Sequence, residues 1–149
     1  MSSAGSGSPD APTFVDTAVL DALAEDLGDR EVVEEVVRVY LALLPGRQGA
    51  IAAAAEQGDL TRLRREAHTL ASASATVGAL ALRDVCRALE DLPPGSGPAA
   101  SRGLSSTAAQ VGAGTHAVLE AWLPRPAGRA PGGQPARGST DSDATPTAG

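Results

Sequence analysis

Apolar side chains recur at steps of three and four residues through most of the chain, and no segment alternates in the way a half-buried strand does. Aromatic residues, which strands favour, make up only 2% of the sequence. This pattern predicts an all-α protein. Each predicted helix carries one apolar stripe and a short turn joins it to the next. We therefore expect an antiparallel up-down four-helix bundle with one or two short N-terminal capping helices.

Capping residues and helix breakers predict where the helices begin and end. Asp16 is placed to cap a first short helix that ends at Leu27, and Gly28 can adopt the left-handed turn after it. A second helix follows Asp29 and is expected to stop at Pro45-Gly46, because proline lacks the amide that continues the hydrogen-bond ladder. The later predicted helices cover 47–57, 59–76, 80–92 and a last, glycine-containing segment from 104 to 122.

The two ends of the chain differ from the middle in composition. Residues 1–12 and 124–149 consist largely of Ser, Gly, Ala and Pro, with little apolar surface to bury. Such segments are predicted to be disordered, because burial cannot offset the entropy lost on ordering. This leaves 13–123 as a single helical domain.

Charge and cysteine content narrow the classes of function. The formal net charge of -6 argues against a nucleic-acid binder. The sequence contains no apolar stretch long enough to cross a membrane and no secretion signal. Cys86 is the only cysteine, which excludes an internal disulfide, and the two histidines are far apart in the sequence, so no metal site is expected. We expect a cytoplasmic protein that binds neither nucleic acid nor membrane.

His68 is predicted to face solvent from the helix over 59–76. At roughly 100° per residue it lies about 125° from the centre of that helix's apolar stripe. Two arginines precede it by one turn and three small residues follow it on the same outer face: Arg64, Arg65, Ala71, Ser72 and Ala75. A nucleophilic ring beside cations, on a surface without large side chains, suits docking by a second protein that carries a phosphoryl group.

From about Leu20 to Trp122 the chain resembles a histidine-containing phosphotransfer domain of the bacterial multistep phosphorelay. The resemblance is carried by Gly58-Asp59-Leu60, Ala67-His68-Thr69-Leu70, Val77-Gly78-Ala79, Leu82, Cys86, Leu89 and Glu90. It implies a four-helix bundle whose exposed His68 accepts a phosphoryl group from an aspartyl phosphate on a receiver domain and passes it on. The implied partner is the receiver domain of a response regulator or of a hybrid histidine kinase. The implied protein is a carrier without turnover or cofactor of its own, and the magnesium belongs to the receiver.

The chain departs from this family just after the histidine. The family typically has Leu-Lys-Gly-Ser there, and this chain has Leu70-Ala71-Ser72-Ala73. The family's lysine places a cation beside the phosphoryl oxygens, which Ala71 cannot do. Arg64 or Arg65 is a possible substitute, since a guanidinium binds phosphate oxygens through two donors. Ser72 is small enough to keep most of the space that the family's glycine leaves open.

Other interpretations of these residues remain open. Because Ala71 replaces the cation, the domain is alternatively a degenerate adaptor or decoy that binds a receiver or kinase without being phosphorylated. A purely structural bundle or a catalytic domain fragment is a third alternative. Glu90 either orients the His68 ring or is a solvated acid at the end of its helix. We expect Cys86 to fill the core and His116 to have a structural role. We expect a monomer, although the helix from Val32 to Leu44 is apolar on more than one side.

Overall fold

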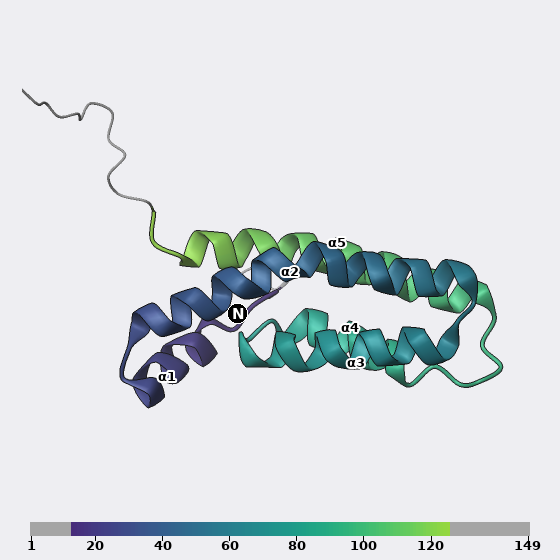
Figure 1. The fold of residues 1–149 in the computed structure, drawn as a ribbon, viewed down its shortest axis with the longest axis horizontal. Coiled ribbons are helices and arrows are strands. Elements are labelled where there is room, and N and C mark those ends of the chain that lie inside the picture. The colour runs from purple at the N-terminus through teal and green to yellow at the C-terminus, as the bar shows by residue number, and fades with distance from the viewer. Residues whose placement is uncertain (1–12, 126–149) are drawn as a thin grey trace, which may run out of the picture.

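The computed structural model describes residues 13–125, which form five helices and no strand (Figure 1). In chain order these are α1 (Thr17–Leu27), α2 (Arg30–Gln57), α3 (Leu60–Thr76), α4 (Leu80–Glu90) and α5 (Pro98–Trp122). α2 and α4 each pack against both α3 and α5, and α1 packs against α2. The predicted all-α four-helix bundle with a short N-terminal helix is confirmed. The segments predicted to be disordered lie almost entirely outside the described residues.

The predicted caps are present at three helix starts. The side chains of Asp16, Asp29 and Asp59 accept hydrogen bonds from backbone amides of the first turn, at 3.1, 2.9 and 3.0 Å. Gly28 ends α1 in the left-handed conformation, with φ of 73°. Such bonds satisfy amides that have no partner within the helix, so these boundaries follow directly from local sequence.

The predicted stop at Pro45 is wrong. α2 continues through this proline and merges with the helix predicted over 47–57. An interior proline costs roughly 3 kcal/mol because it removes one hydrogen bond and crowds the preceding turn. Here Pro45 is exposed, while Leu44 before it and Ile51 after it are buried in the core. Packing on both sides of the proline therefore holds one continuous helix.

α5 begins earlier than predicted, at Pro98. Proline suits the first position of a helix, since its missing amide would have had no partner there. The glycines of α5 are points of close contact: a Cβ at Gly112 would collide with the side chain of Gln48, and one at Gly114 with the ring of Phe14. These two residues weaken the isolated helix but let α2 and the N-terminal segment approach it.

Gly78 forms the turn that joins α3 to α4. Its φ of 76° is in the left-handed region, and its carbonyl accepts a hydrogen bond of 2.8 Å from the amide of Asp16. A Cβ at this position would lie 2.5 Å from the carbonyl oxygen of Asp16. The turn is therefore fixed both by its own conformation and by the chain segment that enters α1.

A buried polar pair joins α2 to α3 inside the core. The hydroxyls of Tyr40 and Ser74 lie 2.8 Å apart. Burial raises the pKa of Tyr40 to about 12. Burial, with a smaller effect of Glu90, also raises the pKa of Cys86 to about 12. Both groups are protonated at neutral pH, and the prediction that Cys86 fills the core is confirmed.

Within residues 13–125, none of the helices combines the length and apolar character that crossing a bilayer requires.

Candidate functional site

His68 lies midway along α3 with its ring in solvent. Its side chain is 72% exposed, as the helical spacing predicts. Ala67, one residue before it, and Leu70, two residues after it, point the other way and are buried. The ring therefore projects from a helix whose opposite face is anchored in the bundle.

Glu90 holds one nitrogen of this ring. Its carboxylate Oε1 lies 2.9 Å from His68 Nδ1, and the Glu90 side chain is only 27% exposed. An ionised carboxylate can only accept hydrogen bonds, so Nδ1 carries the proton in the neutral ring and Nε2 keeps its lone pair. Of the two sequence interpretations of Glu90, the structure agrees with the one in which it orients the ring.

The two arginines before His68 have different surroundings. Arg65 is exposed. Arg64, which we expected on the open outer face, is half-buried, and its Nη2 donates a hydrogen bond to the backbone carbonyl of Leu92. Its Nε is buried without a hydrogen-bond partner among the described residues. Arg64 is thus bound to the segment just after α4, and of the two only Arg65 is freely presented to solvent.

The prediction that Ala71 lies on the open outer face is wrong, because Ala71 is only 4% exposed. By helical geometry it lies about 60° around α3 from His68, on the same side as Arg64, where α4 packs. Ser72, turned about 40° the other way, is exposed, and Ala75 is half-buried. The open surface beside His68 therefore runs over Ser72 and away from α4.

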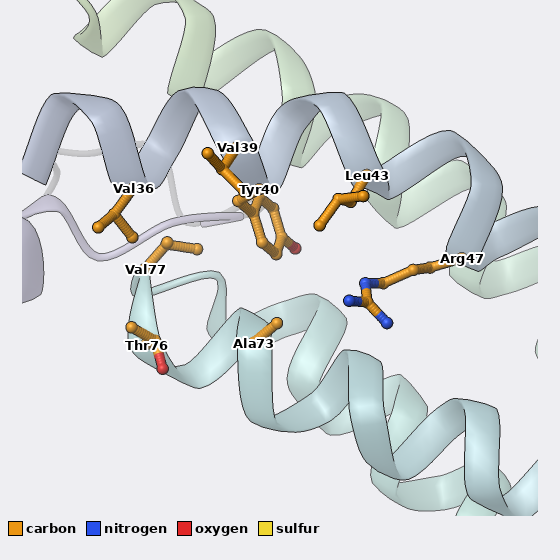
Figure 2. Close-up of a pocket in the computed structure, with 8 residues that line it drawn as sticks. All are labelled: Val36, Val39, Tyr40, Leu43, Arg47, Ala73, Thr76 and Val77. Atoms are coloured by element: carbon orange, nitrogen blue, oxygen red, sulfur yellow. The ribbon is translucent and has the colours of Figure 1, made fainter.

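A groove of about 250 Å³ lies between α2 and α3 (Figure 2). It is lined by Val36, Val39, Tyr40, Leu43, Arg47, Ala73, Thr76 and Val77. Val39 and Leu43 are 48% and 47% exposed, which agrees with the expectation that this helix is apolar on more than one side. Figure 2 shows Val36 and Val77 at one end and Arg47 at the other. Because α2 and α3 are antiparallel, Arg47 marks the end nearer His68.

The second histidine has a different environment. His116 Nδ1 lies 3.9 Å from Glu120 Oε1, one turn further along α5, and its side chain is 40% exposed. No group of three or more His, Cys, Asp or Glu side chains within 13–125 is arranged to hold a metal ion. Among the described histidines, only His68 combines high exposure with a close carboxylate from another helix.

Sequence reasoning missed the contact between Arg64 and Leu92. The signal for it is the pair Pro93-Pro94, which offers no backbone amide to the carbonyls at the end of α4. Carbonyls in such a place require a donor from elsewhere. The sequence shows this requirement but not which side chain meets it.

Comparisons with known proteins concern the fold and the family of the chain. A search of curated proteins gives no match. The structure is similar to the crystal structure of histidine-containing phosphotransfer protein B from Pseudomonas aeruginosa PAO1, with a TM-score of 0.64 and 19% sequence identity over 76% of this chain and 96% of that chain. At this identity the likeness shows the fold. The family description "Hpt domain" matches residues 35–123, more than half of the sequence. The chain therefore belongs to the Hpt domain family, which supports a phosphotransfer role within a phosphorelay.

Proposed function

We propose that this protein is a phosphorelay intermediate whose phosphorylation site is His68. It accepts a phosphoryl group from an aspartyl phosphate on a receiver domain and passes it on, as a cytoplasmic, monomeric carrier with no turnover of its own. The observation that carries the proposal is the exposed ring with Nδ1 held 2.9 Å from Glu90. This arrangement presents Nε2 to an incoming partner.

The transfer needs little from the protein beyond this alignment. The lone pair of Nε2 forms a bond to phosphorus while the bond from phosphorus to the aspartyl oxygen breaks, and the aspartate leaves as a carboxylate. The ring gains positive charge as the N–P bond forms. The Glu90 carboxylate, which accepts the Nδ1 proton in a hydrogen bond, lies where it stabilises that charge.

Arg65 is the residue that we assign to the phosphoryl oxygens. It is one turn from His68 and exposed, whereas the guanidinium of Arg64 is engaged at Leu92. A guanidinium offers two parallel donors to phosphate oxygens, which replaces in part the cation missing at Ala71.

The partner-docking face consists of the outer surface of α3 around Ser72 and the apolar groove of Figure 2. Both lie on the side of His68 that α4 does not cover. A receiver that placed its aspartyl phosphate against Nε2 would cover Ser72 without meeting a large side chain and could bury apolar surface against Val39 and Leu43.

One observation favours the adaptor or decoy alternative. Ala71, in place of the family's lysine, is buried against the bundle and offers no cation to a phosphoryl group. If Arg65 does not supply the missing charge, the domain retains a docking face and an oriented ring but transfers phosphate slowly or not at all.

The test is incubation of the full chain with a receiver domain that carries a labelled aspartyl phosphate and with magnesium. We expect a label on this protein that acid removes and alkali does not, as for a phosphohistidine. His68→Gln abolishes it, and His116→Gln, the matched change at the other histidine, leaves it intact. Tight binding of the receiver without any label would instead establish the decoy, and neither binding nor label would point to a structural bundle.

A further inference from the structure

We propose that Arg64 is a positioning residue for phosphoryl transfer, which acts by fixing the end of α4 so that Glu90 holds the His68 ring. The inference rests on the proposed function of His68 but concerns a residue that touches neither the ring nor, on this account, the phosphate. Its basis is the hydrogen bond from Arg64 Nη2 to the carbonyl of Leu92.

The end of α4 depends on this bond for a backbone reason. Glu90 is the last residue of α4, and the chain continues through Asp91 and Leu92 into Pro93-Pro94. The two prolines have no amide hydrogen with which to continue or tighten the last turn. Beyond them, the amide of Ser96 bonds to the Pro93 carbonyl at 3.0 Å and not to that of Leu92. The Leu92 carbonyl is left to a side chain, and Arg64 provides the donor.

The position of Arg64 connects this bond to the ring. Arg64 and His68 are one turn apart on α3, and Leu92 follows Glu90 by two residues. Two links therefore join α3 to the end of α4: Arg64 to Leu92, and His68 to Glu90 at 2.9 Å. The first link is half-buried and the second is largely exposed. The bond from Arg64 to Leu92 fixes the backbone at the end of α4. Because that backbone is fixed, Glu90 can orient the His68 ring.

The burial of Arg64 separates this role from a direct phosphate contact. Its Nε is buried and lacks a partner among residues 13–125, so the guanidinium is held by packing. To reach a phosphoryl group on Nε2 it would have to leave the Leu92 carbonyl and its packing site. Arg65, the next residue, is exposed and has no such constraint.

The decisive measurement is which nitrogen of His68 carries the proton, read from long-range ¹⁵N–¹H NMR spectra of the full chain at mildly alkaline pH, where histidine rings are largely neutral. We expect the Nδ1–H form in the wild type and a shift toward the Nε2–H form in Arg64→Met, which keeps the packed stem but removes the donors. Transfer from a phosphorylated receiver should slow on the order of tenfold, as misplacement of a reacting group does. Arg64→Lys, which keeps the charge but has a single nitrogen on a shorter side chain, should be intermediate in both readouts. Arg62→Met, an equal loss of charge on the same helix, should match the wild type.

The combination of readouts distinguishes the alternatives. Slower transfer with an unchanged ring tautomer in Arg64→Met would mean a phosphate contact and would overturn the positioning role, as would wild-type behaviour in both readouts. If Arg64→Met does not fold, Arg64→Lys decides, because a wild-type tautomer and rate in that variant refute the proposal. In a Glu90→Ala background Arg64→Met should have no further effect on the tautomer. If the wild type takes up no label at all, the proposed function fails, while the tautomer still tests Arg64.

Discussion

The two faces of α3 differ in their surroundings: one packs inside the bundle and the other is exposed to solvent. The inner face, with Leu63, Leu70 and Ser74, is buried against the rest of the bundle. The outer face carries Arg65, His68 and Ser72 in solvent. Residues on the inner face are surrounded on all sides by other helices, and a change there must alter packing. On the outer face the interactions of His68 depend on one carboxylate from α4.

This difference indicates that stability and transfer are separable in this protein. The inner face determines whether α3 exists as a helix in the bundle, because most helical stability in proteins comes from packing of the apolar side. The outer face determines what the helix presents to a partner. Substitutions on one face should therefore leave the property set by the other nearly unchanged.

The largest expected effect is that of Leu70→Ala on stability. Truncation of a fully buried leucine leaves a cavity, and we expect the free energy of unfolding to fall by about 3 kcal/mol. His68→Gln, two residues away on the outer face, should change it by less than about 0.5 kcal/mol. Urea denaturation measures both. Equal losses for the two variants would contradict the separation of the faces.

Alkaline pH should also destabilise the protein through the core around Ser74. Burial raises the pKa of Cys86 from 9.0 and that of Tyr40 from 10.0, each to about 12. The folded state thus binds these protons more tightly than the unfolded state, so the stabilisation is complete below about pH 9 and is lost as pH rises toward 12. Between pH 8 and pH 10 the free energy of unfolding should drop by about 2 kcal/mol. In a Tyr40→Phe, Cys86→Ala double variant, a drop as large as in the wild type would assign the pH dependence to other groups.

Glu90→Ala tests the outer face. Loss of the acceptor frees the ring to rotate, and we expect transfer to slow on the order of tenfold, equivalent to about 1.4 kcal/mol. Unfolding by urea should be little affected, because the pair is largely exposed. Asp91→Ala removes the neighbouring carboxylate and should transfer at the wild-type rate. If Asp91→Ala slowed transfer as much as Glu90→Ala, the effect would be one of net charge.

The smallest expected effect is that of Tyr40→Phe, about 1 kcal/mol of stability, because the Ser74 hydroxyl loses its partner within the core. Adding Ser74→Ala should recover part of this loss, since neither hydroxyl is then left buried alone. Thermal unfolding of both single variants and of the double variant gives the coupling energy. Strict additivity of the two losses would mean that the hydroxyls do not stabilise one another.

Features set by nearby residues could be predicted from the sequence. The caps at Asp16, Asp29 and Asp59 depend on bonds within the first turn, and the exposure of His68 depends only on its angle from the apolar stripe. The contact of Glu90 with His68 was one of two interpretations that the sequence left open. These interactions are local, or repeat with the period of the helix.

Features set by distant packing could not be predicted. Pro45 does remove a helical hydrogen bond, as expected, but the packing of Leu44 and Ile51 in the core holds α2 together across it. Ala71 is small enough to suit an open surface, and only the approach of α4 makes it buried. The pairing of Arg64 with Leu92 depends on where the loop after α4 places a carbonyl. In each case a segment far along the chain decides the outcome.

The bond between the Asp16 amide and the Gly78 carbonyl has a mechanical consequence. It attaches the segment that enters the domain to the turn between α3 and α4, with the Asp16 carbonyl in close contact with Gly78. A pulling force applied ahead of Phe14 would meet the contact of the Phe14 ring with Gly114 of α5 and then this turn, before it reached α2, since both attachments precede α1 in the chain. Tension on that end of the domain would therefore reach the two helices that carry His68 and Glu90 before it reached α1 and α2.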